Sequence, residues 1–166
     1  MASAMLTLRL HLQLGPEKGL VYLAYGHFEP ERHAGRFTAA TETDMSTVGA
    51  TLETMYRILD EGTRNPATDA ELRDGRLWIV GAAAIELQSI RYHASAREAI
   101  ALYNKAIDYY DHYPQRLSEV TAEQVRQVIA KYLQPQQTVI VVVAPADAVK
   151  TQLERFGAVE VVPMPN

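Results

Sequence analysis

The segment between residues 27 and 33 carries the residue types that most readily bind a metal ion. Two histidines and two glutamates alternate there with other residues: His27, Glu29, Glu31 and His33. In a β-strand, alternate side chains point to one face, and imidazole and carboxylate groups are suitable zinc ligands. Pro30 interrupts the run, however, and the segment has the composition of a hairpin loop. A solvated loop is therefore the favoured interpretation. A zinc site, with a small independent enzyme built around it, is the alternative.

The other histidines and the tyrosine-rich segment are better explained by structure than by chemistry. His11 lies among leucines, and His93 and His112 lie singly near the ends of expected helices. The tyrosine-rich segment has partly helical spacing, which is typical of core packing rather than of a ligand cage. Its members are Tyr103, Tyr109, Tyr110 and Tyr113. The sequence has no glycine-rich phosphate loop, no Gly-x-Ser-x-Gly and no zinc motif of the His-Glu-x-x-His or His-x-x-Glu-His type. It has no cysteine, which excludes disulfides and thiolate chemistry.

Length and composition indicate an ordinary globular domain. The chain has 166 residues, 48% of them hydrophobic and 22% charged, and its net charge is −4. We expect one domain, over residues 1–166. Lysines and arginines are scattered, so a nucleic-acid partner is not expected. We see no signal-peptide core and no apolar run of membrane-spanning length, which leaves periplasm and cytoplasm both open if the source is bacterial.

The order of the expected elements predicts an α+β fold. Two β-branched and aromatic segments, 20–27 and 36–41, flank a Pro- and Gly-containing connection, as in a hairpin. Four helices are expected between residues 46 and 135, two of them opening with capping-box patterns at Thr68 and Thr121; Pro114 is expected to end the third. The uniformly β-branched segment 138–143 predicts a buried central strand, and a short helix and a last strand over 159–162 follow. The sheet would hold about four strands, rich in antiparallel pairs, against a block of helices.

The segment 6–14 admits two interpretations. Leucine occupies every second position from Leu6 to Leu14, and a period of two favours a strand. On a helix, Leu6, Leu10 and Leu14 would share one face, with the other leucines almost opposite. The residues alone favour the strand.

Several motifs, in order along nearly the whole chain, resemble the second, non-zinc domain of the pitrilysin/insulinase family of zinc metallopeptidases. They are Arg9-Leu10-x-x-x-Leu14-Gly15-x-Glu17-Lys18-Gly19-Leu20-Val21-Tyr22, Gly35-Arg36-Phe37 followed by Thr41, Thr68 with Glu71-Leu72, Val120-Thr121 with Val125, and Tyr132-Leu133-x-Pro135 followed by 139–145. The resemblance implies a mitochondrial-processing-peptidase-like fold and a helix over 6–14, and we follow it there. It also implies that the front of the domain, about two strands and most of a helix, is missing.

The resemblance implies a role without chemistry of its own. In such enzymes a separate zinc domain hydrolyses the peptide, and the second domain closes the chamber and holds the substrate. The family pairs a tyrosine, here Tyr22, with an arginine seven residues earlier, where this chain has Gly15. We therefore expect no metal and no activity in this chain alone, with zinc only in a separate catalytic domain or subunit. The alternative is a structural assembly subunit, as in the cytochrome bc1 core proteins. Missing strands also predict an uncovered sheet edge, and so a homodimer or a partner that completes the sheet.

Overall fold

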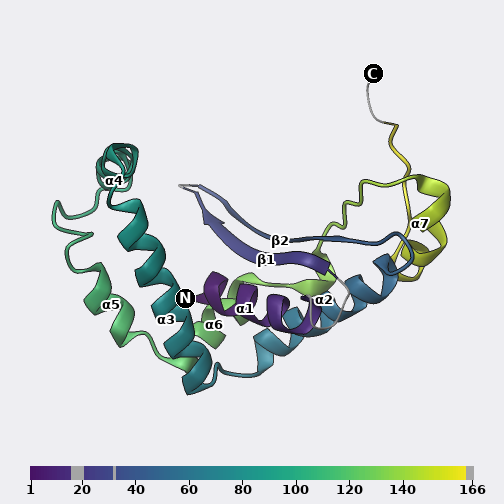
Figure 1. Cartoon of the computed structure of the whole chain (residues 1–166), viewed down its shortest axis with the longest axis horizontal. Helices are drawn as coiled ribbons and strands as arrows, with labels where there is room; N and C mark the ends of the chain where they lie inside the picture. Colours follow the sequence, from purple (N-terminus) through teal and green to yellow (C-terminus); the bar gives the residue numbers. More distant parts are fainter. Residues whose placement is uncertain (16–20, 32, 164–166) are drawn as a thin grey trace.

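The computed structural model describes residues 1–15, 21–31 and 33–163 and confirms the α+β class. The elements are α1 (Ala2–Leu14), β1 (Val21–Pro30), β2 (Gly35–Thr43), α2 (Val48–Arg64), α3 (Asp69–Glu86), α4 (Ile90–Leu102), α5 (Tyr113–Glu119), α6 (Ala122–Tyr132), η2 (Pro135–Gln137), α7 (Ala146–Leu153) and η3 (Glu154–Phe156). Figure 1 shows the β1–β2 hairpin lying over α1, with α3, α4 and α5 extending to one side and α7 at the other. Among the described residues, no helix combines the length and apolar character needed to cross a bilayer.

Helix α1 is the centre of the molecule, so the strand favoured by the leucine alternation is wrong and the resemblance is right. It packs against β1, α2, α3 and α6. Leu6, Leu10 and Leu14 are fully buried, whereas Leu12 is 60% exposed. Leucine at every second position always contains a set spaced by four, and that set suits a helix buried on one face. Leucine, methionine, alanine and arginine also favour helices intrinsically, and β-branched residues are nearly absent from the segment.

The hairpin is confirmed, with longer strands than expected. β1 and β2 pair antiparallel, with Gly26 opposite Ala39 and Phe28 opposite Phe37, and their pairing continues to Pro30 and Gly35. The rings of Phe28 and Phe37 lie 4.7 Å apart and pack with Ala39 against the core around Met5 and Leu6 on α1. The inner face of the hairpin is therefore fixed on α1.

The expected four-stranded sheet is wrong for the part of the chain that the structure describes, which holds one sheet of two strands. The segments 138–143 and 159–162 are extended but unpaired, and their valines are largely exposed. A strand needs a neighbouring backbone to complete its hydrogen bonds, and β-branched composition cannot supply one. The first residue of segment 138–143 and the helix that follows the segment, α7, contact α2 instead. The hydroxyls of Tyr56 and Thr138 lie 2.6 Å apart, and Gln152 on α7 accepts from the N–H of Gly49.

In the helical block, the two predicted capping boxes are confirmed, whereas the predicted number of helices is wrong. Both capping boxes form, at Thr68 with Glu71 and at Thr121 with Gln124. The block contains five helices, α2 to α6, rather than four. The expectation that Pro114 ends the third helix is wrong, because α4 already ends at Leu102. Pro114 instead lies in the first turn of α5, where its missing N–H leaves no intrahelical bond unmade.

Candidate functional site

The outer edge of β1 is closed by two hydroxyls of α1. The Thr7 hydroxyl donates to the carbonyl oxygen of Gly26 at 2.9 Å and accepts from the Gly26 N–H at 3.0 Å. One turn earlier, the Ser3 hydroxyl accepts from the N–H of Phe28 at 3.0 Å. Side-chain oxygens thus satisfy backbone groups that would otherwise bind another strand. The signal for this arrangement was present in the sequence as two hydroxyls four residues apart in an apolar segment, and the sequence reasoning missed it.

The outer edge of β2 is open. Since the backbone groups of Gly26 point away from β2, its opposite residue Ala39 also directs its N–H and C=O outward, as in any non-hydrogen-bonded antiparallel pair. The same holds every second residue, for Gly35, Phe37 and Thr41. Within the described ranges, no residue donates to or accepts from these outward groups. This edge can therefore accept an extended peptide by strand addition.

The solvent face of the hairpin carries two exposed tyrosines and part of the predicted metal cluster. Tyr22 is 85% exposed and Tyr25 is also exposed, next to His27 on the same strand. Glu29 makes a close ion pair with Arg36 directly across the ladder, and this hydrogen bond lowers the pKa of Glu29 below its usual range. The face is thus aromatic near the start of β1 and charged near its end.

The four residues of the predicted cluster lie in two settings. His27 and Glu29 belong to β1, whereas Glu31 and His33 are exposed in the turn. In the described ranges, no three histidine or acidic side chains are placed together to hold a metal ion. Glu29 is already engaged by Arg36. The zinc alternative thus stays a prediction that metal analysis of the purified chain would test.

Gly15, which stands at the position of the family's arginine, occupies a confined place. It is buried at the end of α1, where its N–H donates to the carbonyl oxygen of His11 at 2.8 Å. A Cβ added to Gly15 would collide with that oxygen. The backbone there has no room for an arginine side chain unless the end of α1 shifts. The residues between Gly15 and Val21 lie outside the described ranges.

We expect Gly15→Arg to destabilise the protein rather than to rebuild an arginine–tyrosine pair. The end of α1 must shift to relieve the collision with the His11 carbonyl, at a cost of about 1–3 kcal/mol in the free energy of unfolding. Urea denaturation followed by circular dichroism measures this change. Gly81→Arg is the matched control, because a Cβ at Gly81 meets no atom within 4 Å. Equal stability of the two variants would contradict the prediction.

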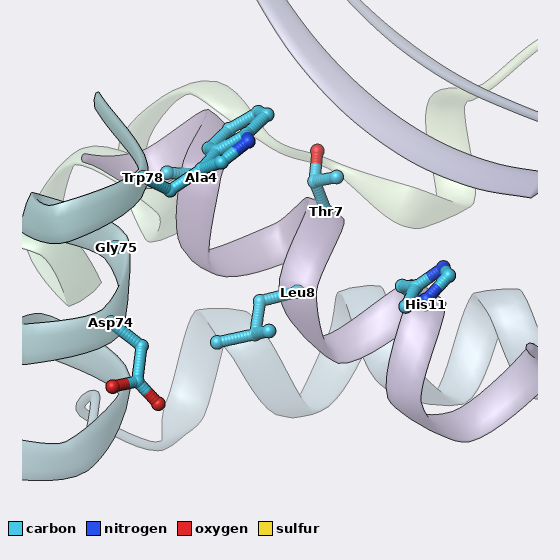
Figure 2. A pocket seen from close by; sticks show the side chains of 7 residues that line it. All are labelled: Ala4, Thr7, Leu8, His11, Asp74, Gly75 and Trp78. Atoms are coloured by element: carbon cyan, nitrogen blue, oxygen red, sulfur yellow. The ribbon is translucent and has the colours of Figure 1, made fainter. Parts of the chain in front are cut away.

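A small cavity lies elsewhere, between α1 and α3. It encloses about 190 Å³, less than drug-sized ligands need, and is lined by Ala4, Thr7, Leu8, His11, Asp74, Gly75 and Trp78. Figure 2 shows Leu8 between the two helices, with Asp74 and Trp78 on α3 and His11 further along α1. Thr7 already bonds to β1. This cavity is a less suitable candidate site than the hairpin.

Comparison with solved structures identifies the architecture. Over 80% of its length, the chain matches the inactive domain of peptidase M16 from Pseudomonas fluorescens, with a TM-score of 0.63 and 22% sequence identity. The chain has the fold of an inactive M16 peptidase domain. The periplasmic protease PqqL from Escherichia coli matches over the same share, with a TM-score of 0.62 and 14% identity. No protein-family profile and no curated protein sequence matches the chain.

The M16-type fold confirms the resemblance to the pitrilysin/insulinase family, which is peptidase family M16. The matched region spans 34% of the Pseudomonas chain and 15% of PqqL, so each neighbour contains much more protein than is seen here. At these identities the likeness establishes the fold alone. The roles of Tyr22 and of the open β2 edge in an M16-type domain therefore remain predictions.

Proposed function

We propose that this chain is a non-catalytic domain that holds a peptide substrate beside a zinc-bearing catalytic domain or subunit. The observation that carries the proposal is the asymmetry of the hairpin, whose β1 edge is closed by Ser3 and Thr7 while its β2 edge is open. The fold of an inactive M16 domain supports the same role. The sequence lacks the zinc motif needed for hydrolysis.

The peptide would lie along β2 as a third strand. Its backbone would pair with the outward groups of Phe37, Ala39 and Thr41, which provide affinity without regard to sequence. Alternate peptide side chains would rest on the solvent face of the hairpin. Across the ladder, Tyr25 lies opposite the small Ala40, which leaves room for an aromatic ring to reach over β2. Exposed tyrosines are well suited to this contact because they offer a rigid, amphipathic surface.

We expect Ala39→Pro to weaken peptide binding by about tenfold or more, since proline removes an outward N–H that the peptide needs. The hairpin's own ladder does not use that N–H, so the fold should persist. Fluorescence anisotropy with a labelled, unstructured peptide of about ten alternating apolar and polar residues measures the affinity. We expect Tyr22→Ala to weaken the same complex by a smaller factor, because one exposed aromatic contact is lost.

The matched control for strand addition is the same peptide with every second backbone nitrogen methylated. If the methylated peptide binds the unmodified chain as tightly as the parent peptide, the proposed binding mode is wrong. The full chain with added zinc should show no chelator-sensitive cleavage of the peptide. Saturable cleavage would show that the domain is catalytic.

A structural assembly role is the second candidate, and a different observation favours it. The middle and end of α3 and the start of α4 expose large apolar side chains, including Leu77, Ile85 and Ile90. Clustered exposed apolar residues commonly mark an interface with another protein. Under this alternative, the chain would bind a zinc-bearing subunit through α3 and α4. Ile90→Asp would then abolish that complex, and Ala39→Pro would leave it intact.

A further inference from the structure

The segment 138–143, here called the valine segment, has a strand's composition and no strand partner. Val139, Val141 and Val143 are 88, 81 and 82% exposed, whereas Ile140 and Val142 are half-buried against their own chain. The backbone of residues 139–143 makes no hydrogen bond to any described residue. Its backbone groups are left to water, and an extended backbone with free edges is a template for pairing with another strand.

The surroundings of the valine segment suit pairing with an identical segment. Residues 132–146 contain no charged side chain, so two copies can approach without charge repulsion. Pro135 and Pro145 stand at the two ends and limit any ladder to the residues between them. Short, uncharged, β-branched segments without proline are those that most readily pair with their own kind. The other open edge, on β2, carries Arg36 and Glu42 and so lacks this uncharged character.

We propose that two copies of this chain pair through their valine segments, antiparallel and about a two-fold axis at Val141. In this register Val141 faces its counterpart, and Val139 of each copy faces Val143 of the other. Opposite residues of an antiparallel pair project to the same face, so the exposed valines of both copies gather on one side. Shifting the register by one residue would bring exposed valines opposite half-buried ones. A second copy is the occupant because it supplies a strand of matching length, composition and unpaired backbone.

We expect the full chain to dimerise in a concentration-dependent manner in sedimentation or light-scattering measurements. Val141→Lys should raise the dissociation constant of the dimer by at least about tenfold, since it places two lysines opposite each other at the axis. The monomer should remain folded, because Val141 packs against little of its own chain. Val162→Lys is the matched control: it introduces the same charge at another exposed valine and should leave the dimer unchanged.

Mixing Val141→Lys with Val141→Glu supplies a test specific to this register. Each variant alone should be mainly monomeric, and an equal mixture should regain dimers that contain one copy of each. Amide hydrogen exchange in the valine segment should slow as the fraction of dimer rises. A single-chain mass at every concentration would overturn the proposal, and so would dimers that Val141→Lys leaves intact. Slow exchange in a purely monomeric sample would overturn it as well, because the partner strand would then belong to the same chain.

Discussion

Leu10→Ala is expected to lower the free energy of unfolding by about 3 kcal/mol, within the range measured for leucines in well-packed cores. The Leu10 side chain is fully buried and belongs to the cluster formed with Val21, Ala24, Met55 and Ile58. It also lies directly against the backbone of Gly26, where an added Cβ would come within 3.4 Å of its methyl group. Alanine would therefore leave a cavity where α1, the hairpin and α2 meet. Urea denaturation monitored by circular dichroism measures the loss.

Leu12→Ala is the matched control, with the same substitution two residues later on α1. Leu12 is mostly exposed, so its change should stay within about 0.5 kcal/mol. The pair also tests the helix itself, because a strand with alternating leucines would place Leu10 and Leu12 on one face and give them similar effects. Comparable losses for the two variants would show that the leucine segment is not the helix described.

The second large effect is expected at the ion pair between α1 and the start of α3. The guanidinium of Arg9 donates to both carboxylate oxygens of Glu71, at 2.5 and 3.0 Å, and only 12% and 19% of the two side chains are exposed. Exposed ion pairs contribute little to stability, whereas breaking a fully buried pair leaves a buried charge without a partner, which is costly. This pair lies between the two cases, so we expect Arg9→Met to lower the free energy of unfolding by about 2 kcal/mol. Chemical denaturation near neutral pH measures it.

The pH dependence of stability supplies an independent check on this pair. Hydrogen bonding from Arg9, followed by that from Thr68, lowers the pKa of Glu71 in the folded protein. A lowered folded pKa means that the contribution is present above the unfolded pKa, at about 4.3, and is lost as the pH falls through the folded value. Arg9→Met should therefore remove part of the loss of stability seen on acidification below about pH 4.5.

Glu71→Gln separates the ion pair from the helix cap. Gln124 caps α6 through the same pattern that Glu71 uses on α3, so glutamine at position 71 can keep the cap while losing the charge. The double variant with Arg9→Met should then be destabilised by less than the sum of the two single variants. Strict additivity would show that Arg9 and Glu71 do not stabilise each other.

The two open backbones of this domain lead to separate tests. Ala39→Pro acts on the β2 edge and should leave dimerisation unchanged, whereas Val141→Lys acts on the valine segment and should leave peptide affinity per chain unchanged. If one variant abolished both properties, the two surfaces would be one. The proposed peptide site and the proposed dimer would then have to be reconsidered together.

Local signals in the sequence were reliable where their physical cause is local. The capping boxes at Thr68 and Thr121 form because each needs only four consecutive residues. The hairpin forms between neighbouring segments, and its strands are rich in β-branched and aromatic residues. The order of motifs along the chain was sufficient to predict the M16-type fold, which the solved structures confirm.

The sequence by itself thus determined the class of the fold, the hairpin, the starts of α3 and α6 and the absence of a zinc motif. Tertiary structure alone decided which leucines of α1 are buried, because spacings of two and four are both present in that segment. It also decided that β1 is closed by Ser3 and Thr7, and that 138–143 is extended without being part of a sheet. Outside a hairpin, a strand needs a partner backbone that lies far away in the sequence or in another molecule, and β-branched composition indicates only the capacity to pair.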